Sequence, residues 1–162
     1  MHHKFRNHGM IRFDVMAEDS WNTQGQRAQA GLEPVRRLLG EWSGVGVCHD
    51  AAVTGHMSLT VLLDGSWIQA VETLLDATGQ SVHTDLCLYR FDVENDTLVA
   101  LQLFERGSQM SSPVEVLDDG FRWITGPGAP QLRFVSSADT FSYTVILPDE
   151  DAPVVEMTYK RA

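Results

Sequence analysis

From residue 41 onward, apolar and polar side chains alternate along short segments of the chain. Residues two apart in a strand share one face of a sheet, so this alternation predicts half-buried β-strands. Turn-forming pairs such as Asp64-Gly65 and Asp119-Gly120 interrupt the alternation about every 12 residues, as in β-barrels and β-sandwiches. The pattern predicts ten strands: Glu41–His49, Thr54–Leu63, Trp67–Leu75, Val82–Phe91, Leu98–Glu105, Ser108–Leu117, Phe121–Thr125, Gln131–Ser136, Thr140–Leu147 and Val154–Arg161.

The connections between these segments are short, which makes neighbouring strands antiparallel. No helical pattern within the strand region is long enough for a parallel crossover. An open meander of this length would expose two sheet edges, and closure removes both. The fold class predicted is therefore all-β: a closed antiparallel up-and-down β-barrel of about ten strands.

The segment before the first strand has the pattern of a short helix, Glu33–Leu39. Pro34 suits the first turn of a helix and Gly40 suits its end. Because so short a helix is not stable alone, we predict that it is a plug over one barrel end. Residues 1–23 are expected to form a flexible extension, and residues 24–162 a single β-barrel domain. The apolar side of the plug would comprise Leu32, Val35, Leu38 and Leu39.

The first strand opens with the pattern G-x-W-x-G-x-G at residues 40–46. Trp42, Gly44 and Gly46 share one face of that strand. We expect the indole to fill the closed end of the barrel. The two glycines would let the strand bend and would leave space beside it.

The fourth and fifth strands identify the face that turns inward. A hairpin around residues 92–97 would pair Phe91 with Leu98 and Cys87 with Gln102. One face then mixes aromatic and polar groups, which suits a small-molecule pocket, and a ten-strand barrel is wide enough to enclose one. The candidate ligand-binding residues are Trp42, His83, Asp85, Tyr89, Gln102 and Phe104.

The opposite face of the same two strands is aliphatic. If the first face turns inward, these side chains form a contiguous outer patch that is large for a monomer. Two-fold symmetry is the simplest way for one patch to bury itself, so we expect a homodimer. The residues of this outer patch are Leu86, Leu88, Val99, Leu101 and Leu103.

The chain carries a formal net charge of −10, from 22 Asp and Glu residues against 12 Lys and Arg residues. This charge repels nucleic-acid phosphates and anionic membranes, so neither is expected as a partner. The longest apolar runs are far shorter than the roughly 20 residues that span a bilayer. Cys48 and Cys87 lack C-x-x-C spacing, and we expect free thiols in a reducing cytoplasm.

Candidate chemistry centres on His83 and Asp85, because a carboxylate two residues away on a strand can orient an imidazole. The two residues form either an acid/base pair or a structural contact. Four further charges either anchor a carboxylate ligand inside the barrel or lie on its outer surface: Arg122, Arg133, Glu72 and Glu156.

The sequence motifs assign no catalytic residue and no metal site. The histidines near the N-terminus belong either to a metal-binding tail or to a tail without that role. They are His2, His3 and His8.

The layout of a G-x-W-x-G-x-G pattern after a short helix, followed by ten strands, resembles the nitrobindin family of haem-binding barrels. Residues 81–90 are similar to that family's P-x-H-x-E-x-G-[YF] segment, whose histidine lines the cavity. The resemblance implies a lipocalin-like barrel with His83 and Asp85 facing inward. Residues 155–161 look more like a related group of uncharacterised bacterial proteins with the same barrel and opening motif.

One departure from the nitrobindin pattern concerns the haem ligand. Nitrobindin-like proteins hold the haem iron with a histidine close to the C-terminus, whereas no histidine follows His83 here. The last strand offers only Met157, Tyr159 and Lys160. A ferric iron can be held by Tyr or Cys instead.

The leading hypothesis is a cytoplasmic protein that holds a small apolar or amphipathic molecule inside the barrel, without a cofactor. A haem-binding or nitric-oxide-binding protein of the nitrobindin type is one alternative. An isomerase-type or cyclase-type enzyme that uses His83 and Asp85 is the other.

Overall fold

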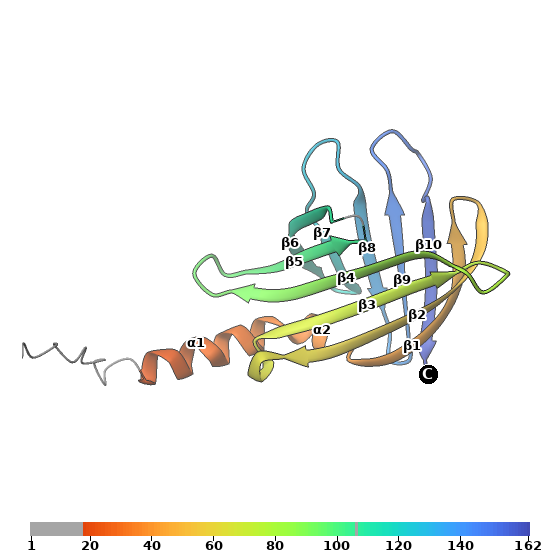
Figure 1. Ribbon diagram of the computed structural model, residues 1–162. Coiled ribbons are helices and arrows are strands. Elements are labelled where there is room, and N and C mark those ends of the chain that lie inside the picture. Colours follow the sequence, from red (N-terminus) through yellow and green to blue (C-terminus); the bar gives the residue numbers. More distant parts are fainter. Residues whose placement is uncertain (1–17, 106) are drawn as a thin grey trace, which may run out of the picture.

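The alternating segments fold as consecutive antiparallel strands, and the first strand pairs with the last, so the sheet closes (Figure 1). The computed structural model describes residues 18–105 and 107–162. The predicted closed barrel of ten strands is confirmed. The strands are β1 (Gly40–Cys48), β2 (Ala51–Leu62), β3 (Trp67–Leu75), β4 (Ser81–Asp92), β5 (Thr97–Phe104), β6 (Gln109–Leu117), β7 (Gly120–Trp123), β8 (Gln131–Ser136), β9 (Thr140–Ile146) and β10 (Val155–Arg161).

The first hairpin is tighter than the sequence predicted. His49 and Asp50 both have positive φ, 47° and 64°, and they form a two-residue turn that pairs Cys48 with Ala51. Turns with two positive φ values match the twist of the flanking strands. The strand β2 therefore begins at Ala51 rather than at the predicted Thr54.

The up-and-down topology gives the barrel two different ends. The connections after β1, β3, β5, β7 and β9 lie at one end, which we call the mouth end. The connections after β2, β4, β6 and β8 lie at the other, the closed end. The helices α1 (Glu18–Gly31) and α2 (Glu33–Arg36) lead into β1 at the closed end (Figure 1).

The helix α1 is not predicted by the sequence pattern, from which residues 18–23 are expected in a flexible extension and no helix is expected before Glu33. Residues 1–17 of that extension lie outside the described residues. The backbone of α1 lies close to the Phe91 ring of β4. A Cβ added at Gly31 would lie only 2.1 Å from that ring. A helix without a wide apolar stripe leaves little periodic signal in the sequence.

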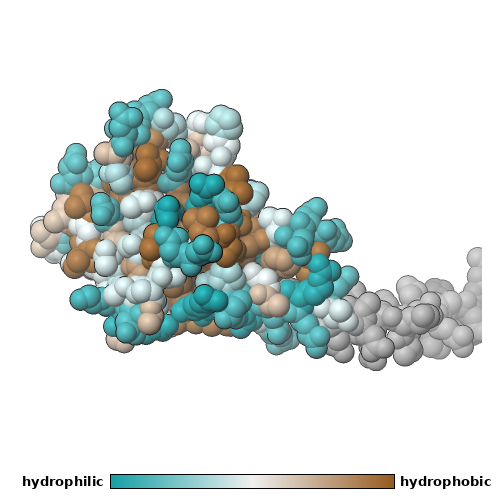
Figure 2. Space-filling view, turned by 180° about the vertical axis from the view of Figure 1, so that it is seen from behind, coloured by the Kyte–Doolittle hydropathy of each residue, from teal (hydrophilic) through white to brown (hydrophobic). Residues whose placement is uncertain are grey.

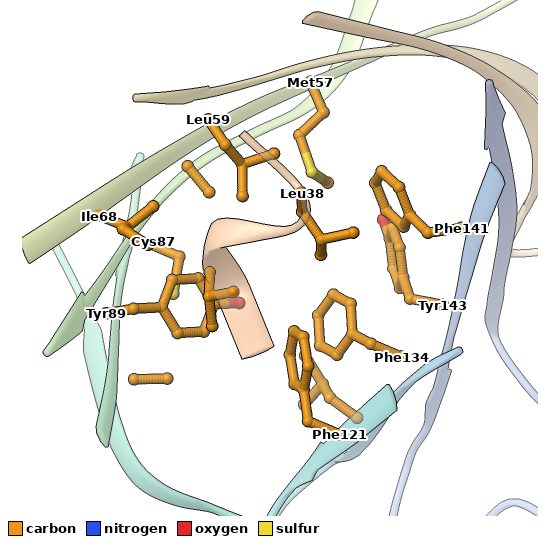
Figure 3. Packing of buried hydrophobic residues seen from close by; sticks show 14 of the residues in the cluster. Leu38, Met57, Leu59, Ile68, Cys87, Tyr89, Phe121, Phe134, Phe141 and Tyr143 are labelled. Atoms are coloured by element: carbon orange, nitrogen blue, oxygen red, sulfur yellow. The ribbon is translucent and has the colours of Figure 1, made fainter. Parts of the chain in front are cut away.

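The predicted plug over the barrel end is confirmed, but its helix α2 ends at Arg36 rather than at the predicted Leu39. Leu32, Val35 and Leu38 have exposed fractions of 0%, 0% and 3%. Figure 3 shows Leu38 pointing into a ring of barrel side chains. The Arg36 guanidinium donates a 2.8 Å hydrogen bond to the Gly65 carbonyl in the β2–β3 connection. This contact fastens the helix to the closed end.

Trp42 and aromatic side chains of β9 and β10 complete the closed half of the core. The Trp42 indole is fully buried, and its Nε1 donates a 2.7 Å hydrogen bond to the Leu38 carbonyl. Its ring meets Phe141 edge-on, at a centroid separation of 4.9 Å. Phe141 in turn stacks on Tyr159 at 4.8 Å. The predicted placement of the indole at the closed end therefore agrees with the packing.

The glycines of β1 and β2 make room for the inward side chains of β10. A Cβ added at Gly44 would lie 2.7 Å from the Tyr159 ring, and one at Gly55 would lie 2.3 Å from the Tyr159 hydroxyl. Gly46 faces Met157 in the same way. The Tyr159 side chain therefore lies across two glycines and reaches toward β3.

The predicted register of the fourth and fifth strands is confirmed, with Phe91 opposite Leu98 and Cys87 opposite Gln102. Inward side chains such as Tyr89 are buried, whereas the outer patch is half-buried. Figure 2 shows one face of the molecule, on which apolar side chains gather between polar ones. No helix of the described residues has the length and apolar character needed to cross a membrane.

We predict that Gly46→Ala destabilises the barrel. Its added methyl group would meet the Glu156 carbonyl oxygen at 2.0 Å and the Met157 sulfur at 2.5 Å. Overpacking of this kind costs about 1–3 kcal/mol, measured as the free energy of unfolding in urea. The matched control is Gly126→Ala, where an added Cβ meets nothing within 4 Å. Equal stability of the two variants would contradict the packing of β10 against β1.

Candidate functional site

The mouth half of the barrel encloses a cavity of about 300 Å³. This volume is at the lower end of the range for small-molecule pockets. Most of the wall is apolar and comes from the inward faces of strands on all sides of the barrel. Side chains of this wall include Met57, Leu59, Ala70, Leu74, Leu132 and Val145.

Five of the six predicted ligand-binding residues line this cavity: His83, Asp85, Tyr89, Gln102 and Phe104. The hairpin register places them on one face of β4 and β5. Trp42 does not line the cavity but lies beside the plug helix at the closed end. Its contacts with Leu38 and Phe141 give it a role in closing the barrel.

Three polar side chains converge on one side of the cavity, and we call Glu72, His83 and Asp85 the polar cluster. Glu72 on β3 is the cross-strand partner of Asp85 on β4. His83 lies two residues before Asp85, and its Nε2 is 3.5 Å from Asp85 Oδ2. One ligand-type atom from each of the three residues lies within 4.8 Å of the other two.

Glu72 is held by two tyrosines that reach across the barrel. The Tyr143 hydroxyl donates a 2.7 Å hydrogen bond to Glu72 Oε2, and the Tyr159 hydroxyl donates to Oε1. The neighbouring carboxylate is also hydrogen-bonded, because the Gln102 side-chain amide donates to Asp85 Oδ2. Glu72 has an exposed fraction of only 5%. Both oxygens of a buried carboxylate are thus hydrogen-bonded, as burial requires.

Burial and, to a smaller extent, the nearby Asp85 carboxylate together raise the pKa of Glu72 to about 7. The tyrosine hydrogen bonds act in the opposite direction. The pKa of His83 is also raised, chiefly by its hydrogen bond to Asp85. Near neutral pH, Glu72 therefore exists as a mixture of the acid and the carboxylate.

Burial and the neighbouring Glu72 raise the pKa values of Tyr143 and Tyr159. Both tyrosines therefore keep their protons and act as hydrogen-bond donors. Trp123 is another donor in the cavity wall. Its Nε1 is buried and has no hydrogen-bond partner within the described residues.

Glu72 is one of four charged residues for which the sequence leaves open an inward or an outward position. Arg122 and Arg133 lie on the outer surface, where they pair with Glu115 and Asp119. Glu156 is also exposed. Only Glu72 faces the cavity. In β3, Ile68, Ala70, Glu72 and Leu74 occupy alternate positions and all four are buried, so Glu72 lies on the inward face.

The last strand contributes little to the cavity wall. Met157 and Tyr159 are fully buried but lie outside the lining, and Lys160 is exposed. The Tyr159 hydroxyl is already engaged with Glu72. Among the described residues of β10, only Val155 lines the cavity.

Comparison with known proteins does not identify a family for this chain. No protein-family model matches this chain, and no curated protein matches it significantly.

We predict that Glu72 makes the protein less stable as pH rises. Its pKa is near 4.5 in the unfolded chain and about 7 in the folded one, so between these values only the folded state holds the proton. The stability that this proton provides is complete below pH 4.5 and is lost as pH rises through 7. The loss is about 3 kcal/mol.

The control is Glu72→Gln, which imitates the protonated acid and cannot titrate. Urea unfolding of both proteins in buffer with EDTA, from pH 4.5 to 8, measures the difference between them. We expect the free energy of unfolding of the parent protein to fall relative to that of the variant across this range. Parallel pH profiles would show that Glu72 has an ordinary pKa.

Proposed function

We propose that the protein binds a small, mostly apolar molecule inside the barrel. The observation that supports this proposal is the cavity of about 300 Å³, whose wall is apolar except for a few placed polar groups. Pockets for small molecules have this composition, because apolar surface provides affinity and the polar groups fix orientation. The closed half of the barrel is filled by side chains, so the ligand would enter from the mouth end.

The polar groups of the wall favour an amphipathic ligand. The polar cluster lies on the β3–β4 side, and the Trp123 Nε1 is a donor without a partner in the described part of the chain. A buried donor without a partner costs about 1–3 kcal/mol. A ligand with an acceptor beside Trp123 and a polar end beside the cluster would satisfy both. Free Cys48 and Cys87 support the proposed cytoplasmic location.

An isomerase-type or cyclase-type enzyme is the second candidate, and one specific observation favours it. Glu72 has a pKa of about 7 and lies beside His83 and Asp85 in the cavity. A general acid or base works best when its pKa is near the working pH. The proposed enzyme would thus use Glu72 in addition to the pair that the sequence indicated.

The haem-binding alternative has weaker support. A closed ten-strand barrel fits a lipocalin-like fold, which nitrobindin-type proteins share. The last strand, however, directs no side chain of a haem-ligand type into the cavity wall within the described residues. We therefore propose an organic ligand rather than haem.

We predict that a larger side chain at Ala70 blocks ligand binding. Ala70 is buried and lines the cavity, so Ala70→Phe would place a ring in the ligand's space. The uncharged dye N-phenylnaphthylamine, whose fluorescence increases in apolar surroundings, serves as the probe. We expect saturable binding of one dye per chain, weakened at least about tenfold in the variant, which corresponds to about 1.4 kcal/mol.

The matched control is Ala52→Phe, which adds the same ring to an exposed position of β2. This variant should bind the dye like the parent protein. Absence of dye binding by the parent protein would contradict the proposed function, as would unchanged binding by Ala70→Phe.

We also propose that the outer patch joins two copies of the chain. Register places Leu86 opposite Leu103 and Leu88 opposite Leu101, so the aliphatic side chains form cross-strand pairs. The cross-strand partner of Leu86 on β3 is Val71, which extends the patch. Covering both patches would contribute several kcal/mol, at roughly 25 cal/mol per Å² of apolar area. The association entropy offsets part of this gain.

Leu101→Arg is expected to convert a dimer to a monomer, because the charge would be buried at the interface without a partner. Light scattering at micromolar concentration measures the mass. A parent protein that already has the 18.0 kDa mass of one chain would contradict the proposed dimer.

A further inference from the structure

The polar cluster brings three side chains of metal-binding type together in the cavity wall. A carboxylate from β3, a carboxylate from β4 and an imidazole from β4 point to one place in the cavity wall. We propose that Glu72, His83 and Asp85 bind a divalent first-row transition-metal ion such as Zn²⁺. This proposal goes beyond ligand binding and does not depend on it.

The distances within the cluster suit one metal ion. Zinc binds nitrogen and oxygen ligands at about 2.0–2.2 Å, so two ligands of a tetrahedral site are roughly 3.3 Å apart. His83 Nε2 and Asp85 Oδ2 are 3.5 Å apart, and a Glu72 oxygen completes a set in which all separations are within 4.8 Å. Small side-chain rotations would bring the three donors to bonding distance.

Hydrogen bonds already orient both carboxylates. Tyr143 and Tyr159 donate to Glu72, and Gln102 donates to Asp85. Donors of this kind fix the direction of a metal-binding carboxylate, and each oxygen retains a lone pair for the metal. The backbone pairing of Glu72 with Asp85 fixes the spacing of the two strands.

The charge of the cluster also favours a cation. No Lys or Arg lines the cavity in the described ranges, so the carboxyl groups of Glu72 and Asp85 share a low-dielectric wall without a permanent positive charge. On the outer surface, by contrast, Glu115 and Asp119 are paired with Arg122 and Arg133. A divalent ion would supply the missing charge.

The donor types restrict which ion would bind. An imidazole nitrogen favours zinc, iron or nickel over magnesium and calcium, which take oxygen ligands. Three protein ligands leave at least one coordination position free, as in zinc sites that bind a further molecule. That position would face the cavity. The alternative to a metal ion in this acidic pocket is an organic amine, whose positive charge would also pair with the carboxylates.

Cobalt provides the test, because Co²⁺ replaces Zn²⁺ and its visible absorption reports coordination. The test uses the full chain with His2, His3 and His8 changed to Ala, so that the N-terminal histidines cannot bind the ion. After removal of metal with EDTA, Co²⁺ is titrated while the absorption is recorded. We expect one Co²⁺ per chain with intense bands of low coordination number. Zn²⁺ should displace it, and excess Ca²⁺ should not.

Three conservative variants in the same background locate the site: Glu72→Gln, His83→Gln and Asp85→Asn. Each should weaken Co²⁺ binding at least about tenfold, with an unchanged circular dichroism spectrum. His83 is one-third exposed, so its variant is expected to fold even if a variant at a more buried position does not. The matched control is His56→Gln, which breaks an exposed pair with Glu41 on the outer surface.

Two results would overturn the metal proposal. One is the absence of Co²⁺ binding, whether or not hexylamine, the probe for an organic amine, binds in the cavity. The other is wild-type affinity in the His83→Gln variant. Dye binding is measured on the same samples, so that the proposed metal site and the proposed apolar ligand are tested separately. Dye binding without Co²⁺ binding contradicts only the metal site, and the reverse contradicts only the apolar ligand.

Discussion

A carboxylate inside an apolar barrel needs hydrogen-bond donors around it, and the interior is arranged to supply them to Glu72. Tyr143 from β9 and Tyr159 from β10 cross the barrel to reach its two oxygens. Tyr159 can do so only because Gly44 and Gly55 leave its ring room to lie flat across β1 and β2. The opening glycine motif is therefore explained by a residue more than a hundred positions away.

The same arrangement divides the interior in two. Side chains in and beside α2 and the aromatic residues Trp42 and Phe141 fill the closed half, while the mouth half keeps a cavity with Glu72 in its wall. The barrel is too wide for one layer of side chains to fill. A cavity that joins apolar walls to a cluster of two carboxylates and one imidazole suits both a small organic ligand and a metal ion.

Alternation and turn chemistry were enough to predict the barrel, its strand order and the register of β4 with β5, because each strand has one buried face. The β4–β5 residues of the site followed from that register. Glu72 did not, because a lone carboxylate on a strand usually faces solvent. Trp42 lies at the closed end as predicted, and it therefore does not reach the cavity wall. α1 left no apolar stripe from which to predict it.

The most direct test of this account is a crystal structure of the full chain. The account predicts that both tyrosine hydroxyls are bonded to Glu72 and that a cavity of about 300 Å³ remains open beside it. A Glu72 side chain that is turned to solvent, or a mouth half in which the walls meet and leave no cavity, would contradict it.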